Sequence, residues 1–457
     1  KAILPFQITR EINFKALNSF FRYNYIPAPE SIFTGIHKVM PACLIEWKGG
    51  EITTEKYYSY YPSDTTFKGS YGSAVQGVRS LLIDSTHQRM ISDVPLGSFL
   101  SGGVDSSIVS AIAAKETKHL NTFSIGFKDQ PQFDETKYAN EVAKHIKSNH
   151  TVFSLSNDDL LSHFEDTLTY LDEPFADSSA LNMFILSKRT KEQVTVALSG
   201  DGADEMFSGY NKHEALFFSD QRTAKNQMIK NLGGIASILP KSRNSKWSNK
   251  FRQLDKYHKG LKLTPNDRYL EWASFMDSGQ VSRLLKGGNA IQEFEFLNCS
   301  TGSFNDYLYY DFNLVLEGDM LRKVDSMSMA NGLEVRSPFM DYRLVDYVFS
   351  LPPEFKIDAS SRKKILKDAF KSDLPSSIFS RGKKGFEVPL QEWFKNELAS
   401  YLDEKVFNQE LIIEQGILNW EEVLAIKQKL HSSNPNEAVY NTWALLSFQH
   451  WYNSYVC

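Results

Sequence analysis

The chain has 457 residues, of which 42% are hydrophobic and 23% are charged, and its formal net charge is -4. This length exceeds one ordinary core, so we expect a globular protein of two or three domains. The charge balance excludes a bulk basic surface, and no apolar run is as long as a membrane span, so nucleic acid and membrane are not expected partners. The cysteines, Cys43, Cys299 and Cys457, lie far apart, which indicates a reducing, cytoplasmic setting without disulfides.

The first 62 residues predict a β-rich segment that is too short for a core of its own. A hairpin is expected from Cys43–Trp47 and Ile52–Tyr58, on either side of the turn residues Lys48–Glu51. We interpret residues 1–62 as the end of a domain whose beginning lies upstream. Residues 63–457 are then the main domain.

From about Ser73 onward, predicted helices and strands alternate, which is typical of an α/β fold with a parallel, doubly wound sheet. Helices are expected over Val75–Met90, Ser106–Glu116, Thr136–Ile146, Asp158–Leu171 and Ala180–Lys191. Strands are expected over Val94–Leu100, Thr122–Phe127, Thr151–Leu155 and Val194–Leu198. From about residue 211 the pattern predicts a mostly helical extension. Within it, the basic stretch 241–250 is expected to be a loop on the surface, either solvated or mobile.

The strongest sequence signal is the heptad Ser101–Ser107, which reads Ser-Gly-Gly-Val-Asp-Ser-Ser between a predicted strand and a predicted helix. Its glycines let the backbone approach an anion, and the start of a helix offers N–H donors. Its serines add hydroxyl donors, and Asp105 can bind Mg²⁺ whose other ligands are phosphate and water oxygens. The Gly-Lys-Ser/Thr ending of a Walker loop is absent. The pattern favours a phosphate-binding loop over the alternative, a plain strand–helix turn with a serine cap.

A second glycine-rich segment, Leu198–Tyr210, also follows a predicted strand. Its carboxylates Asp201, Asp204 and Glu205 lie so close in sequence that they repel one another, and a bound cation would offset this repulsion. An acidic turn is the alternative interpretation. Because ligands bind at the carboxyl ends of parallel strands, we expect both loops to meet at one ligand.

The heptad is similar to the pyrophosphate loop of the N-type ATP pyrophosphatases, and the second loop resembles the asparagine synthetase branch of that group. Further matching motifs are Phe133–Glu135, Leu171–Pro174, Asp325–Ala330, Glu334–Asp341 and Lys383–Phe386. The resemblance covers almost the whole chain. It implies the PP-loop fold of the adenine-nucleotide α-hydrolases, preceded by the last part of an N-terminal-nucleophile glutaminase domain.

The resemblance implies ATP and Mg²⁺ as ligands and assigns roles to individual residues. Positions that match ATP contacts are Phe99, Ser101, Gly102, Gly103, Asp105, Ser106, Ser107, Ile125, Ser199 and Gly200. Asp105 and Asp204 match magnesium ligands. Asp201 matches an acidic residue that helps ammonia to attack, and Lys363 matches a lysine that neutralises developing charge. From the residues alone, Lys363 would be part of a basic helix face. Charged residues that belong either to the site or to a structural ion-pair network are Arg322, Lys323, Asp325 and Glu334–Arg336.

The implied reaction is an ATP-dependent amide synthesis. A carboxylate attacks ATP to form an adenylate and release pyrophosphate, and ammonia then displaces AMP. The side chain of aspartate is the first expectation for the acceptor, and asparagine would be the product. Two departures bear on this choice. Asp201 stands where many members have glutamate, and the segment 172–179 lacks the arginine that meets the substrate's α-carboxylate in many aspartate-using members.

These departures leave other functions open. One alternative is amidation of a cell-wall or polysaccharide carboxylate, and another is an intramolecular amide-forming cyclase of the β-lactam or lasso-peptide type. A non-enzymatic nucleotide sensor is disfavoured, because both loops keep their functional residues.

The nitrogen donor is expected to be ammonia, supplied directly or derived from glutamine. Glutamine-hydrolysing members begin with a catalytic cysteine, whereas residue 1 here is Lys1. Cys43 lies in an apolar strand pattern and is expected to be a buried structural thiol. Either the upstream glutaminase part is missing or this form lacks that activity. The expected partners are small molecules, and a homodimer is the candidate assembly.

Overall fold

The computed structural model describes residues 1–6, 8–59, 67–130, 134–221, 223–232, 246–287, 290–380, 388–435 and 437–456. Several predictions concern residues outside these ranges, namely Phe133, the motif Lys383–Phe386, the stretch 241–245 and the domain boundary after residue 62. The domain division therefore stays a prediction. The second half of the predicted basic loop is not a loop, because it begins helix α11 (Lys246–Gly260).

Five parallel strands form the central sheet, in the order β5–β4–β3–β6–β7. Their bounds are Leu96–Phe99 for β3, Asn121–Phe127 for β4, Asn149–Leu155 for β5, Val196–Leu198 for β6 and Glu334–Arg336 for β7. The chain runs outward from β3 through β4 to β5 and then crosses back to β6 on the other side of β3. This order confirms the predicted doubly wound α/β fold. Strand β7 was not predicted, because three residues are too few to display a strand pattern.

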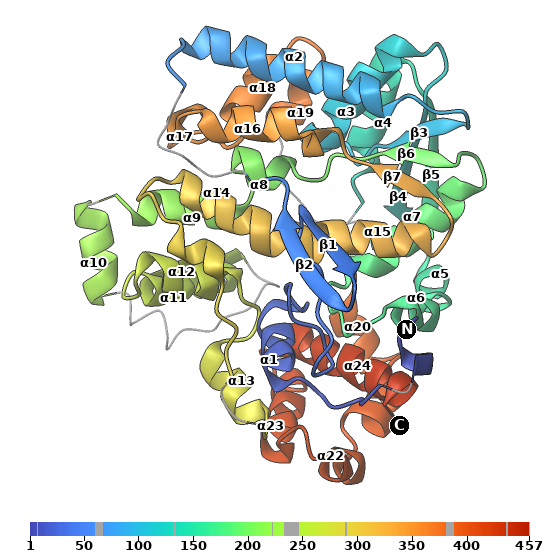
Figure 1. Cartoon of the computed structure of the whole chain (residues 1–457), viewed down its shortest axis with the longest axis vertical. Coiled ribbons are helices and arrows are strands. Elements are labelled where there is room, and N and C mark those ends of the chain that lie inside the picture. Colours follow the sequence, from blue (N-terminus) through green and yellow to red (C-terminus); the bar gives the residue numbers. More distant parts are fainter. Residues whose placement is uncertain are drawn as a thin grey trace.

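Helices cover both faces of the sheet (Figure 1). One face carries α2 (Tyr71–Arg89), α3 (Val104–Glu116) and α4 (Thr136–Ile146), and the other carries α7 (Ser179–Lys191) and α15 (Arg322–Met329). The bounds of α2, α3, α4 and α7 agree with the predicted helices to within a few residues. The helix predicted over 158–171 is instead two helices, α5 (Asn157–Leu161) and α6 (Phe164–Tyr170). They separate where the Ser162 hydroxyl donates to the backbone carbonyl of Asp159, at 2.8 Å.

Beyond residue 210 the described chain is mostly helical, as predicted. The short helix α8 (Ala203–Phe207) lies just before this region. The further α-helices of the region are α9 (Asn211–Ser219), α10 (Ala224–Leu232), α12 (Pro265–Ala273), α13 (Ser278–Leu284), α14 (Asn305–Asp311), α16 (Tyr342–Ser350), α17 (Pro353–Lys356), α18 (Lys364–Phe370), α19 (Ser376–Ser380), α20 (Leu390–Lys395), α21 (Ala399–Tyr401), α22 (Gln409–Gln415), α23 (Trp420–Leu430) and α24 (Ala438–Tyr455). The π-helical segment η4 (Phe312–Leu321) joins α14 to α15 in one continuous rod. Across the described ranges, no helix is both long and apolar enough to cross a lipid bilayer.

The N-terminal segment contains a helix that the β-rich prediction missed, α1 (Phe14–Tyr23). The side chain of Asn13 caps it by accepting from the backbone N–H groups of Lys15 and Ala16. Phe21 of α1 packs edge-on against Phe448 of α24, with ring centroids 5.7 Å apart. The signal was available in the sequence, since Leu17, Phe20 and Phe21 recur at helical spacing.

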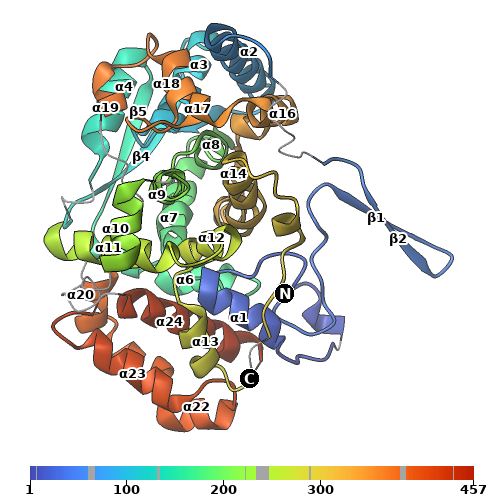
Figure 2. The ribbon, with the colours of Figure 1, turned by 90° about the vertical axis from the view of Figure 1, so that its left-hand side faces the viewer.

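The predicted hairpin is present, with β1 (Cys43–Lys48) antiparallel to β2 (Glu51–Lys56). It projects away from the body of the molecule (Figure 2), and Trp47 is 74% exposed. The expectation that Cys43 is a buried thiol is wrong, because this side chain is only partly buried. The apolar pattern suggested a core strand, but the described hairpin packs against no second layer.

Candidate functional site

Two loops meet at the carboxyl ends of neighbouring strands, as the sequence predicted. Ser98 of β3 is in register with Leu198 of β6, so the segments that follow them emerge side by side where the strand order reverses. Gly200 lets them touch, because a Cβ atom there would lie 2.7 Å from the backbone nitrogen of Ser106. This close approach accounts for a glycine at position 200.

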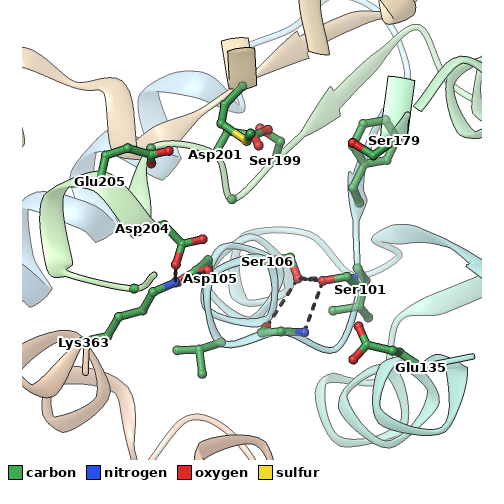
Figure 3. Close-up of a pocket in the computed structure, with 18 of the residues that line it drawn as sticks. Ser101, Asp105, Ser106, Glu135, Ser179, Ser199, Asp201, Asp204, Glu205 and Lys363 are labelled. Carbon is green, nitrogen blue, oxygen red and sulfur yellow. Dashed lines mark hydrogen bonds and ion pairs between the residues drawn. The ribbon is translucent and has the colours of Figure 1, made fainter. Parts of the chain in front are cut away.

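Hydrogen bonds of its own serine hydroxyl groups fix the conformation of the first loop (Figure 3). The Oγ atoms of Ser101 and Ser106 lie 3.0 Å apart, and the backbone N–H of Gly103 donates to Ser101 Oγ at 3.2 Å. Gly103 is the N-cap of α3 and supplies no side-chain acceptor to the first turn. The helix therefore presents an N-terminus suited to an anion. Gly102, with φ +71°, turns toward α4 instead, where a Cβ atom would lie 2.6 Å from the backbone nitrogen of Ala139.

The loops border a cavity of about 470 Å³, a volume typical of small-molecule sites. Predicted residues that line it are Phe99, Ser101, Gly103, Asp105, Ser106, Ser199, Gly200, Asp201, Asp204 and Lys363. Gly102, Ser107 and Ile125 were also predicted but are not among the lining residues. Polar lining residues that were not predicted as site residues are Ser124, Glu135, Asp177, Ser179, Glu205, Tyr210, Arg362 and Lys367, and Lys323, which the sequence left open, also lines the cavity.

Lys363 is held between two carboxylates, one from each loop (Figure 3). Its Nζ lies 2.5 Å from Asp105 Oδ2 and 2.6 Å from Asp204 Oδ1, and the residue is 7% exposed. Burial disfavours its charge, but the two carboxylates outweigh burial and raise the pKa of Lys363 above its usual range. The lysine is the N-cap of α18 and has φ +54°, a left-handed conformation that is costly for a residue with a side chain.

Gly209 leaves the space in which this triad forms. A Cβ atom at Gly209 would lie 1.6 Å from Asp204 Oδ1 and 2.2 Å from Lys363 Cε. Any larger residue at position 209 must therefore displace Asp204, Lys363 or both.

The donor set at these loops fits Mg²⁺ only in part. In the described ranges no three His, Cys, Asp or Glu side chains come together as a metal site. Asp105 and Asp204 do reach one cation, since both contact the ammonium group of Lys363. Two carboxylates suit a magnesium ion whose other ligands are phosphate and water oxygens.

Further acidic groups line the cavity beside this triad. Burial raises the pKa of Asp201, and the nearby Asp204 and Asp105 add to this effect. Glu205 is 1% exposed and accepts from the hydroxyl of Tyr210 at 2.5 Å. Burial raises the pKa of Glu205 to about 7, with a further contribution from Asp204. Both carboxyls are thus easier to protonate than exposed ones.

A second buried ion pair lines the cavity, between Lys323 of α15 and Asp177 just before α7. Lys323 Nζ lies 2.6 Å from Asp177 Oδ2, and Lys323 is 8% exposed. Burial opposes its charge, but Asp177 and Asp319 raise the pKa of Lys323 above its usual range. The residues that were predicted to belong either to the site or to a structural ion-pair network therefore fall into two groups. Lys323 lies at the cavity, whereas Arg336, which is not a lining residue, pairs with the exposed Glu334 at 2.6 Å.

Comparisons with known proteins agree on one family. The sequence profile described as asparagine synthase matches residues 77–453. The glutamine-hydrolysing asparagine synthetase 1 of Bacillus subtilis is 30% identical over 465 residues, which cover 99% of this chain and 71% of the relative. A putative glutamine-hydrolysing asparagine synthetase of Mycobacterium tuberculosis is 27% identical over 84% of this chain and 59% of the relative. Amidase chyE of Penicillium rubens is 24% identical over 85% of this chain and 64% of the relative. The chain thus spans 59% to 71% of the lengths of these three relatives.

Proposed function

Because this chain belongs to the asparagine synthase family of ATP-dependent, amide-forming ligases, we propose that it makes asparagine from aspartate and ammonia. In this reaction the side-chain carboxylate of aspartate attacks ATP, pyrophosphate leaves, and ammonia converts the adenylate to the amide and AMP. The main support is the convergence of two glycine-rich loops on Lys363, which lies between Asp105 and Asp204.

The triphosphate of ATP would lie on the first loop, where the N-terminus of α3 and the serine hydroxyls donate to anionic oxygens. Phe99 lies at the wall where the adenine is expected. The buried Ser107 and Ile125 would support this wall from outside the cavity. Asp105 and Asp204 would hold Mg²⁺, which when bound supplies charge neutralisation for the phosphates.

Charge stabilisation is the main task of the protein groups, because a carboxylate that attacks a phosphate meets another anion. The charged Lys363 suits this task, since its ammonium lies where both loops meet. In the second step, attacking ammonia must lose a proton. Asp201 and Glu205 line the cavity, and burial raises the pKa of each, so either carboxylate can accept that proton.

A pyrophosphate-release assay with ammonia and a panel of carboxylates tests this proposal. The expected products are asparagine, AMP and pyrophosphate, with aspartate as the preferred acceptor. ADP and phosphate would contradict the adenylate mechanism. Preference for a uronate or a cell-wall carboxylate would keep the ligase class but replace aspartate. The segment 172–179, without the expected arginine, is the reason to include these acceptors.

A further inference from the structure

The cationic lining residues Arg362, Lys363 and Lys367 are neighbours in sequence, but the cavity has a further cationic group, Lys323, that comes from a different part of the fold. Lys323 lies in α15, and its partner Asp177 precedes α7, 146 residues earlier in the chain. Both side chains line the cavity, together with Ser179 at the start of α7 and Met320 at the end of η4. These four residues are called here the headgroup subsite. The proposed chemistry at the two loops gives this ion pair no role.

We infer that the headgroup subsite recognises the α-ammonium and α-carboxylate groups of a free amino acid acceptor. In this assignment, which rests on the proposed function, Asp177 contacts the ammonium group and Lys323 contacts the carboxylate. The acceptor class is then an α-amino acid with a second carboxylate on its side chain.

Hydrogen-bond capacity supports the inference. Asp177 accepts from the backbone N–H of Ser179 at 2.9 Å, from the Ser179 hydroxyl at 2.8 Å and from Lys323 at 2.6 Å. A carboxylate has about four acceptor sites, and the neighbouring Asp319 carboxyl also hydrogen-bonds to Asp177, so an incoming ammonium group would take the place of Asp319. Lys323 has three N–H donors; they reach Asp177 and, at 3.6 Å, the weakly accepting Sδ of Met320, while the nearby carboxyls of Asp319 and Asp201 also attract its charge. The pair can therefore bind one ammonium and one carboxylate.

Burial also argues for a ligand. A buried ion pair is a costly way to stabilise a fold, because desolvation of both charges offsets much of their attraction. The side chains of Asp177 and Lys323 are 20% and 10% exposed, and both line the cavity. A ligand with both charges would satisfy the pair without adding net charge to the cavity.

The subsite is well placed for the reacting carboxylate. Asp201 lies near Lys323 as well as near Asp204 and Asp105, since the charges of all three residues act on it. In Figure 3, Ser179 and Lys363 lie on opposite sides of Asp201. An amino acid bound at the headgroup subsite could thus extend its side-chain carboxylate toward Asp201 and Lys363. A polysaccharide uronate has no α-ammonium group and would leave Asp177 without its additional donor.

Two analogues of aspartate test each half of the subsite separately. β-Alanine lacks the α-carboxylate and succinate lacks the α-ammonium, but both retain the carboxylate that would react. With ammonia and ATP, the wild-type protein should prefer aspartate over each analogue by about 100-fold or more in kcat/KM. Lys323→Met should abolish the preference over β-alanine and keep that over succinate, and Asp177→Asn should do the reverse. In both variants the loss should appear in the KM for aspartate, while the KM for ATP stays unchanged.

Controls separate recognition from folding. Arg79 and Asp373 form a partly buried ion pair at 2.6 Å, in which Asp373 also contacts Lys115, and neither Arg79 nor Asp373 is a lining residue of the cavity. Arg79→Met and Asp373→Asn should keep both preferences. An ATP-dependent rise in the melting temperature should persist in every variant if the nucleotide loops are intact. The double variant Lys323→Met/Asp177→Asn removes both charges of the ion pair and should fold even if a single variant does not.

The outcomes distinguish this inference from the proposed function. If glutamate is the preferred acceptor, the proposal that aspartate is the substrate is rejected, but the proposed role of the headgroup subsite is supported. A preferred acceptor without an α-amino acid group would overturn the inference and keep the ligase. Unchanged preferences in Lys323→Met and Asp177→Asn would mean that the pair is only structural. If no acceptor releases pyrophosphate, calorimetric binding of aspartate, β-alanine and succinate decides the matter, and equal affinities in the wild-type protein would overturn the inference.

Discussion

Substitution of Gly209 by alanine should disable the site while the fold persists. Real Cβ contacts are essentially never below 3.0 Å, and the added Cβ atom would lie 1.6 Å from Asp204 Oδ1. If Gly209 keeps its place, Asp204 must move by at least about 1.4 Å, the difference between these distances. The same atom would lie 2.2 Å from Lys363 Cε, so the lysine must move as well. Misplacement of a catalytic group by 1 Å can cost about 10²-fold in rate, so kcat should fall about 100-fold.

Pyrophosphate release at saturating substrates, together with the melting temperature, measures this effect. Overpacking of a dense site should cost about 1–3 kcal/mol of stability, which lowers the melting temperature without unfolding the protein. Gly72→Ala is the matched control, because in helix α2 the added Cβ atom would find its nearest neighbour, Ser70 Oγ, at 3.9 Å. Wild-type kcat in Gly209→Ala would refute the idea that the reaction needs the Asp105–Lys363–Asp204 arrangement.

Three other predictions test the site, the nitrogen donor and the core. Asp105→Ala should abolish pyrophosphate formation while leaving the fold intact, and an active variant with ordinary ATP affinity would reject its role in binding Mg²⁺. The 457-residue chain should use ammonia but not glutamine; amide nitrogen traced from side-chain-labelled glutamine, or glutamate release that Cys43→Ser removes, would contradict this. Burial lowers the pKa of Lys356 to about 7, and its Nζ donates to Asn305 at 2.8 Å. Because the unfolded lysine keeps its proton up to about pH 10.4, the unfolded state binds more protons between pH 7 and 10. The cost of burying Lys356 is therefore complete below pH 7 and fades as the pH rises. Relative to Lys356→Met, the wild-type free energy of unfolding should increase by up to about 1.4 kcal/mol per pH unit over this window, and parallel denaturant-derived curves would refute a neutral Lys356.

The sequence by itself determined the alternation of strands and helices and the positions of both loops. This information is local, because a glycine-rich turn after an apolar strand specifies its own conformation through backbone freedom and N–H donors. The predicted strand over 122–127 and helix over 136–146 accordingly match β4 and α4 within one residue. One local pattern also gave a wrong prediction, that Cys43 is buried. The apolar stretch around Cys43 looked like a core strand, since a sequence pattern cannot reveal whether a second layer covers a hairpin.

Only the tertiary structure decided which distant charges share the cavity. Lys363 is 258 residues from Asp105 and by sequence is one lysine of a basic helix face. Its left-handed backbone at the start of α18 points the side chain between both loops. Lys323 and Asp177 are likewise joined only because α15 and α7 pack on the same face of the sheet. Pairing between charges depends on distance in space and on burial, and neither quantity is encoded in the local spacing of residues along the chain.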